Sequence, residues 1–295
     1  MKIAVTGSSG LIGSALVGRL RGDGHTVVPV VRRTPRPGEV RWDPAAGLLN
    51  PADLEGVDAL VNLAGEGIGD HRWNDEHKQR VVDSRVTGTG LLAETIAGLD
   101  PVPAFLTGSA IGYYGNRGDT ELTEESGPGT GFLADVCRRW EAAATPAERA
   151  GSRVAYLRTG VVLSAHGGAL KKQLPLFKLG VGGRIGSGRQ FFSWITLNDA
   201  VGAIVFVLTA GLSGAVNVTA PEPVTNADFT AAMGRALHRP TVVPVPAAAL
   251  KVALGSEMAS EMVLAGQRVL PAVLQRAGYT FAHPNIDSAL RAVFA

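Results

Sequence analysis

Short apolar runs rich in β-branched residues recur along the chain and alternate with segments of helical periodicity. The runs are KIAVT (2–6), HTVVPVV (25–31), VDALVNLA (57–64), VPAFLTGSA (102–110), SRVAYLRTG (152–160) and GAVNVT (214–219). Runs that are apolar without interruption, with helices between them, are typical of a parallel sheet covered on both faces. The pattern therefore predicts an α/β fold built on a doubly wound parallel sheet.

The pattern changes after about residue 164, where a Gly-rich stretch (180–188) and later a Pro-punctuated helical tail from Pro240 replace the alternation. We expect residues 1–163 and 196–219 to form the domain that contains this sheet, with GAVNVT as its last strand. Residues 164–195 and 220–295 then form a smaller, mostly helical substrate lobe. The apolar stretch 200–210 is shorter than the roughly 20 residues that a membrane span needs, so it indicates a buried helix.

A glycine motif follows the first predicted strand directly and precedes a helical segment. Gly7, Gly10 and Gly13 have the spacing G-x-x-G-x-x-G. Glycines at such a strand-to-helix turn let the backbone approach a pyrophosphate, which binds the N–H groups at the helix N-terminus. The alternative is an ordinary Gly-rich turn. On the first interpretation, residues 1–163 and 196–219 form a dinucleotide-binding domain of the Rossmann type. The predicted contacts to the cofactor in this loop are Gly7, Ser9, Gly10, Leu11, Ile12 and Gly13.

Two arginines, Arg32 and Arg33, stand at the end of the second predicted strand. A dinucleotide fold that selects NAD has an acidic residue near this place, which accepts a hydrogen bond from the ribose 2′-OH. Guanidinium groups can instead pair with a 2′-phosphate. The sequence therefore predicts NADP(H) as the cofactor, unless the two arginines are only solvated at a strand end.

Two further segments are candidates for contact with the cofactor. Asp43 follows Trp42, and its carboxylate could accept from the adenine amino group, although a residue before Pro44 could equally belong to a turn. The segment VNLAG places Leu63, Ala64 and Gly65 after another predicted strand, beside the next part of the cofactor.

The strings TGSSGLIG, VDALVNLAG and SAIGYYG together resemble an extended short-chain dehydrogenase/reductase. Further strings, among them RTGVVLSAHGGAL (158–170) and GVGGRIGSGRQFFSWI (180–195), are similar to its atypical, NAD-dependent epimerase-like subfamily with an additional C-terminal helical domain. In that family a Tyr-x-x-x-Lys pair transfers the proton and holds the nicotinamide ribose. No Tyr-x-x-x-Lys occurs in this chain, and the two places fall on Leu133 and Cys137 if Glu141 is matched to a family glutamate.

This departure leaves the proton transfer without its usual residues. The resemblance and the strand pattern place SAIGYYG at the carboxyl end of a strand, the edge of an open parallel sheet where ligands bind. Tyr113 or Tyr114 could there protonate a carbonyl oxygen while Ser109 holds the same oxygen. The alternative is that both tyrosines pack under the smaller lobe.

Composition limits the partners further. The formal net charge is +2, which argues against a nucleic-acid binder, and one cysteine, Cys137, gives no disulfide or multi-cysteine metal site. His71, His77 and His166 have no metal-ligand spacing to a second His or Cys, so we expect no catalytic metal. The N-terminus lacks the pattern of a targeting segment, which favours a cytoplasmic protein. We expect a small-molecule substrate, no nucleic-acid or membrane partner, and leave a homodimer open.

Two hypotheses about function follow. The first is an NADP(H)-dependent oxidoreductase or epimerase that acts on a small carbonyl, hydroxyl or sugar-like compound. The second is a non-catalytic NADP(H)-binding or redox-sensing protein. The missing Tyr and Lys favour the second, and the retained SAIGYYG loop favours the first.

Overall fold

A computed structural model describes all residues, 1–295, and divides the chain into two compact units. Unit 1 comprises residues 1–109, 136–158 and 201–216, and unit 2 comprises residues 110–135, 159–200 and 217–295. The expected domain bounds differ from this division chiefly at residues 110–135, and with these residues unit 2 is about as large as unit 1 rather than smaller. These residues pack within unit 2 because their strand β7 (Glu121–Leu122) pairs with β14 (Arg268–Val269).

An eight-stranded sheet forms the centre of unit 1 and confirms the predicted fold class. Its order is β12-β8-β6-β5-β1-β2-β3-β4, and β1 is hydrogen-bonded in parallel to both β2 and β5. The strands of this sheet are β1 (Lys2–Thr6), β2 (Thr26–Val31), β3 (Val40–Asp43), β4 (Leu48–Leu49), β5 (Ala59–Asn62), β6 (Ala104–Ala110), β8 (Val154–Thr159) and β12 (Gly214–Val218). All six predicted runs are strands of this sheet, and GAVNVT is its edge strand β12, as expected.

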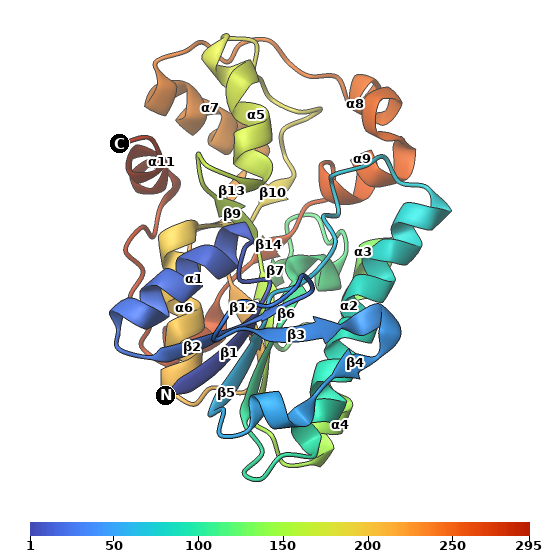
Figure 1. Cartoon of the computed structure of the whole chain (residues 1–295). Helices are drawn as coiled ribbons and strands as arrows, with labels where there is room; N and C mark the ends of the chain where they lie inside the picture. The colour runs from blue at the N-terminus through green and yellow to red at the C-terminus, as the bar shows by residue number, and fades with distance from the viewer. The chain divides into compact units, whose positions relative to one another are not determined.

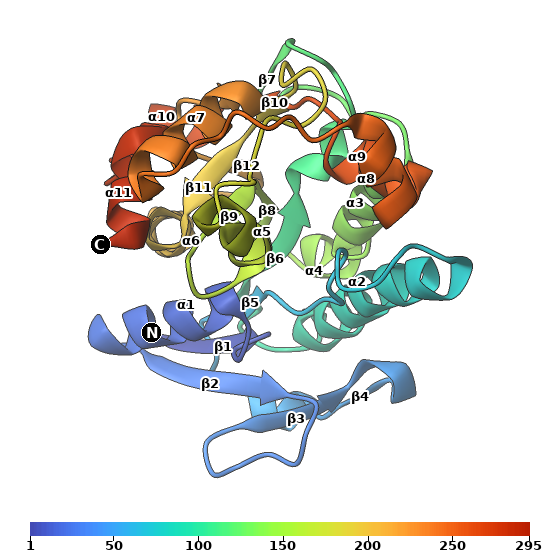
Figure 2. The ribbon, with the colours of Figure 1, turned by 90° about the horizontal axis from the view of Figure 1, so that it is seen from above.

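Helices lie on both faces of this sheet, as its continuous apolar strands require. Helices α1 and α6 cover one face, and α2 and α4 lie on the other (Figures 1 and 2). Their bounds, with those of α3, are α1 (Leu11–Gly22), α2 (Asp75–Ala97), α3 (Phe132–Ala142), α4 (Thr145–Arg149) and α6 (Leu197–Thr209). Short 3₁₀ turns η1 (Pro44–Ala46) and η2 (Pro51–Leu54) flank β4. No helix of the chain combines the length and apolar character that crossing a membrane requires.

Unit 2 is built from helices around its own apolar core. Buried side chains such as Phe177, Trp194, Phe229 and Leu290 belong to one cluster. The helices and short strands not yet named are α5 (Gly168–Lys178), α7 (Asn226–Leu237), α8 (Ala247–Leu254), α9 (Ser256–Met262), α10 (Ala272–Arg276), α11 (Ile286–Phe294), η3 (Ile111–Tyr114), β9 (Val161–Leu163), β10 (Phe191–Phe192), β11 (Trp194–Thr196) and β13 (Val224–Thr225). Helices α5, α7 and α11 surround the cluster.

Candidate functional site

The glycine loop joins β1 to α1 as the sequence predicts. Gly7 has φ 63° and its carbonyl accepts from the N–H of Gly10 at 2.9 Å, which closes a tight turn. Gly10 is the N-cap of α1, and no side chain caps the helix. No acidic residue lies in the first turn of α1. The first N–H groups and the positive end of the helix dipole are therefore left to an anion.

The three glycines of this loop serve different purposes. A Cβ on Gly7 would lie 2.6 Å from the carbonyl of Leu63, and a Cβ on Gly13 would lie 2.1 Å from the oxygen of Gly7. Both positions need glycine for the protein's own packing. A Cβ on Gly10 would meet only the oxygen of Gly7, at 3.3 Å. Gly10 is exposed, so its missing side chain mainly leaves space for a molecule outside the protein.

The other predicted loop residues surround this position. Ser9 is exposed, Leu11 and Ile12 in the first turn of α1 are partly exposed, and Gly13 is buried. The exposed Ser9 and Gly10, with the uncapped first turn of α1 behind them, fit a diphosphate group, which needs N–H donors and a close approach.

The loop after β5 is fixed beside the glycine loop. The Thr6 hydroxyl donates to Asn62 Oδ1 at 2.6 Å and accepts from the N–H groups of Leu63 and Ala64 at 3.2 and 3.3 Å. Asn62 and Thr6 are both buried, so this small network is shielded from water. Leu63 and Ala64 are partly exposed and Gly65 is exposed. A Cβ on Gly7 would lie 2.6 Å from the carbonyl of Leu63 and 2.9 Å from the nitrogen of Ala64, so the start of this loop lies against the glycine loop.

The two arginines after β2 are both exposed, but only one is paired within the protein. Arg33 binds Glu39 through two nitrogens at 2.7 and 2.6 Å, whereas Arg32 has no ion-pair partner in the protein. The hydrogen bond from Arg33, with a further one from the Arg36 N–H, lowers the pKa of Glu39 to about 2. Arg32 is therefore the more available cation for a ligand phosphate.

Asp43 caps the turn that follows β3. Its Oδ1 accepts from the N–H of Ala46 at 3.3 Å, and Pro44 begins η1. The structure thus gives Asp43 the turn role that the sequence left open, and its contact with the cofactor stays a prediction.

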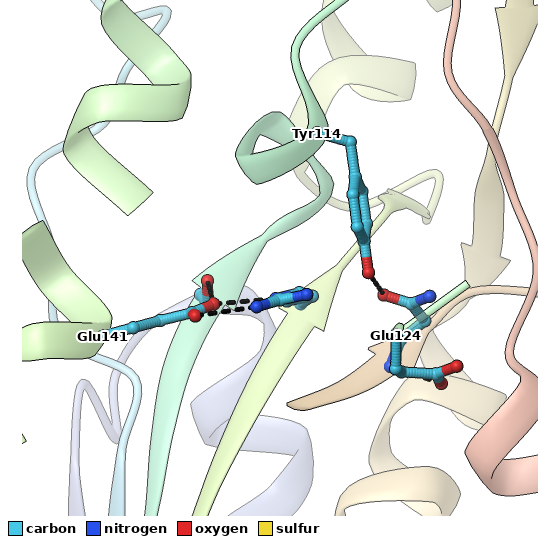
Figure 3. Close-up of polar contacts among 6 residues, drawn as sticks. Tyr114, Glu124 and Glu141 are labelled. Atoms are coloured by element: carbon cyan, nitrogen blue, oxygen red, sulfur yellow. Dashed lines mark hydrogen bonds and ion pairs between the residues drawn. The ribbon is translucent and has the colours of Figure 1, made fainter. Parts of the chain in front are cut away.

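Glu141, which is labelled in Figure 3, lies in a network of three polar side chains in unit 1 that includes Ser109 and Arg158. Ser109 is the member that the sequence singled out. Its hydroxyl donates to Glu141 Oε1 at 2.7 Å, and Arg158 binds both oxygens of Glu141 at 2.8 and 2.9 Å. The side chains of Arg158 and Glu141 are only 6% and 12% exposed. The Ser109 proton is thereby directed at Glu141, so its lone pairs are left to accept a hydrogen bond from a ligand.

The two candidate tyrosines differ in their surroundings. Tyr114 is fully buried and its hydroxyl donates to Asn217 Oδ1 at 2.7 Å, as Figure 3 shows. Asn217 in turn donates from its backbone N–H to Glu124 Oε1 at 3.0 Å. Tyr113 is partly exposed, and its ring meets that of Tyr114 edge-on at 5.4 Å. Tyr114 is thus buried and hydrogen-bonded, while Tyr113 is partly accessible, and a part in proton transfer stays a prediction for both.

Helix α3 carries the places of the missing catalytic pair. The N–H of Leu133 donates to Glu261 Oε2 at 2.8 Å, and Cys137 is buried.

The sequence did not single out the bond between Ser109 and Glu141, because nothing in the spacing of these residues links them. No group of three or more His, Cys, Asp or Glu side chains is arranged to hold a metal ion.

Unit 2 holds a pocket of about 630 Å³, a size that suits a small organic ligand. Its lining includes Asp119, Arg189, Gln190 and Thr225, with Leu264 as an apolar member. The Gly-rich stretch that the sequence singled out thus contributes to this pocket.

The parallel sheet and its glycine loop define a Rossmann-type dinucleotide-binding protein. The model of the NAD-dependent epimerase/dehydratase family matches residues 3–219, and a model described as a domain of unknown function matches residues 245–293. The chain belongs to the NAD-dependent epimerase/dehydratase family, which confirms the resemblance stated above.

Relatives match the chain over its whole length. Epimerase family protein Mb2239 of Mycobacterium bovis is 49% identical over 98% of this chain and 96% of its own. The crystal structure of human epimerase family protein SDR39U1 with NADPH has a TM-score of 0.91 at 37% identity, covering 100% of this chain and 99% of that one. A nucleoside-diphosphate sugar epimerase from Corynebacterium glutamicum is 40% identical with a TM-score of 0.81, covering 100% of this chain and 58% of that chain.

Proposed function

We propose that this protein is an NADP(H)-dependent oxidoreductase or epimerase that acts on a small carbonyl, hydroxyl or sugar-like compound. The observation that carries the proposal is the exposed glycine cradle at the N-terminus of α1, with Arg32 and Arg33 at the end of the adjacent strand β2. Human SDR39U1, which is 37% identical over the full chain, was crystallised with NADPH. The relative described as a nucleoside-diphosphate sugar epimerase favours a sugar-like substrate.

The residues fit the dinucleotide in order along the sheet edge. The N–H groups that follow Gly10 hold the pyrophosphate, and Arg32 pairs with the 2′-phosphate of the adenosine half. Leu63, Ala64 and Gly65 lie on the other side of β1 from Arg32, next to the nicotinamide half. The bound nicotinamide supplies or accepts a hydride, and the protein's task is to hold the substrate and move the proton.

Tyr113 is the group we assign to proton transfer. Its side chain is partly exposed, whereas the hydroxyl of Tyr114 is buried and bonded to Asn217. A phenol that donates to the substrate oxygen as hydride arrives removes the charge that would otherwise build up there. The Ser109 proton is directed at Glu141, so Ser109 does not donate to the same carbonyl oxygen as expected from the sequence. In this scheme Ser109 instead accepts a hydrogen bond from a substrate hydroxyl.

A second function is favoured by the residues on α3. Leu133 and Cys137 stand where the family has its catalytic Tyr and Lys, so the chain could bind NADP(H) and sense redox state without turning over a substrate. The two functions share the cofactor and differ only in catalysis.

A hydride-exchange experiment separates the two functions. The protein is incubated with NADPH deuterated at C4 and a panel of aldehydes and ketones, and separately with NADP⁺ and a panel of sugar nucleotides. Mass spectrometry follows deuterium transfer to the carbonyl compounds, and NMR detects epimerised or oxidised sugar products. Deuterium transfer to a carbonyl compound or conversion of a sugar nucleotide supports the enzyme. Tight NADPH binding without transfer or conversion across both panels favours the sensor, and failure to bind NADPH contradicts both.

A further inference from the structure

Arg85 is a buried arginine on α2 that neither the sequence motifs nor the proposed mechanism uses. It is 7% exposed, and its Nη1 donates to the carbonyl of Val81 at 3.1 Å. Its guanidinium also lies over the ring of Trp140, 5.0 Å from the ring centre. These contacts hold the side chain in one place within unit 1.

One N–H group of the Arg85 guanidinium lacks a hydrogen-bond acceptor. Its Nε is buried and has no hydrogen-bond partner. A buried N–H without an acceptor is costly, and native proteins seldom retain one without a reason. Burial lowers the pKa of Arg85 to about 10, while Cys137 and Glu66 oppose this shift. The group is still a cation at neutral pH, so a ligand oxygen would gain a charge-assisted hydrogen bond.

The guanidinium lies directly against the loop that follows β5. A Cβ on Gly65 would lie 3.2 Å from Cζ and 3.3 Å from Nη2 of Arg85. Gly65 itself is exposed, so only a residue without a side chain separates this cation from the outside. The N–H groups of Leu63 and Ala64 in the same loop donate to the hydroxyl of Thr6, the residue before Gly7. Arg85 therefore lies close to the glycine loop, where we expect the pyrophosphate.

The order of the strands decides which half of a dinucleotide Arg85 faces. Strand β1 lies between β2 and β5, and the glycine loop follows β1. Arg32 and Arg33 at the end of β2 mark the side of the adenosine half. The other half must then extend over the end of β5, where Gly65 and Arg85 lie.

We propose that Arg85 binds the nicotinamide half of the dinucleotide, donating hydrogen bonds to its ribose or adjoining phosphate oxygens. In this proposal the positive charge is supplied by Arg85 on α2. On α3, the place of the family lysine is taken by Cys137, which is not basic. The inference rests on the proposed function, because it requires that a dinucleotide binds at the glycine loop.

Two ligands test this inference. NADPH spans both halves, whereas 2′,5′-ADP occupies only the adenosine half. Both affinities are measured for the wild type, Arg85→Met, which keeps the packing against Trp140, and Arg85→Lys, which keeps the charge. We expect Arg85→Met to weaken NADPH binding about 10- to 100-fold and to leave 2′,5′-ADP binding unchanged. Arg85→Lys should retain part of the lost affinity.

The control is Arg80→Met on the same helix, where the exposed Arg80 pairs with Glu76. It should change neither affinity. The inference is overturned if Arg85→Met binds NADPH with wild-type affinity. It is also overturned if the affinities for both ligands fall equally and the melting temperature drops, because Arg85 is then a structural residue. If the wild type binds neither ligand, the proposed function itself fails.

Discussion

Substitutions of single glycines in the glycine loop should affect cofactor binding and protein stability differently. Gly10→Val should abolish binding of NADPH and NADH, because the side chain fills the exposed space that the pyrophosphate needs. Its melting temperature should stay close to that of the wild type, since a Cβ there meets one protein atom at 3.3 Å. Gly13→Ala is the matched comparison, because its Cβ would lie 2.1 Å from the Gly7 oxygen and should lower the melting temperature as well.

Titration calorimetry and thermal denaturation of both variants check this prediction. Micromolar binding of NADPH by Gly10→Val would show that the dinucleotide binds elsewhere. Gly18→Ala serves as the control, since a Cβ at Gly18 meets no protein atom within 4 Å.

The arginines after β2 should determine the choice between NADPH and NADH. Replacing Arg32 and Arg33 together with Ala should weaken NADPH binding by about 2 to 4 kcal/mol, because charge-assisted bonds to the 2′-phosphate are lost from an exposed site. NADH affinity should barely change. Arg32→Ala alone should cost more than Arg33→Ala, since Arg33 is already bound to Glu39. Calorimetry on the two single variants would contradict this account if Arg33→Ala had the larger effect.

The two tyrosines should respond differently to loss of the hydroxyl. Tyr113→Phe should lower turnover by about 10²- to 10⁴-fold with unchanged cofactor affinity, as expected for loss of a positioned acid. Tyr114→Phe should instead destabilise the protein by about 1 to 3 kcal/mol, because Asn217 loses its buried donor. Steady-state kinetics on a substrate found in the panel, with urea denaturation, distinguish the two. Wild-type turnover by Tyr113→Phe would remove it as the proton donor.

At the scale of elements, one buried ion pair ties α3 to the sheet within unit 1. Glu141 on α3 accepts from Ser109 at the end of β6 and from Arg158 in β8. Glu141→Gln should destabilise the fold by about 3 to 5 kcal/mol, because it leaves the Arg158 cation buried without a counter-charge. The control Glu76→Gln breaks an exposed pair and should cost at most about 1 kcal/mol. Urea denaturation giving equal losses for the two variants would contradict a stabilising role for the buried pair.

The long strands of unit 1 could be predicted from the sequence because each is a continuous apolar run, buried on both faces of the sheet. The glycine loop could be predicted because its spacing stands between a strand and a helix. Strands such as β7 and β14 could not, since two residues carry no periodicity and their pairing depends on segments far apart in the chain. The placement of residues 110–135 in unit 2 follows from that pairing.

At the scale of the whole molecule, the glycine loop could be predicted from the sequence more completely than the surroundings of the candidate catalytic residues. The glycine loop is formed by residues that are neighbours in the sequence. The hydrogen-bond partners of the candidate catalytic groups are far apart along the chain: Tyr114 and Asn217 are separated by 103 positions, and Ser109 and Glu141 by 32. No spacing rule links such pairs. The proximity of Arg85 to Gly65 could not be predicted for the same reason, since it arises only when α2 packs on the sheet.

The central claim is that the chain is an NADP(H)-binding member of its family, and calorimetric titration of the wild-type protein with NADPH and with NADH tests it most directly. With both titrations at the same low ionic strength, the cluster of Arg32 and Arg33 at the end of β2 predicts saturable, one-to-one binding of NADPH. Its affinity should be at least about 10-fold higher than that for NADH, a difference of 1.4 kcal/mol or more. Equal affinities, tighter binding of NADH, or no binding of either dinucleotide would contradict the account.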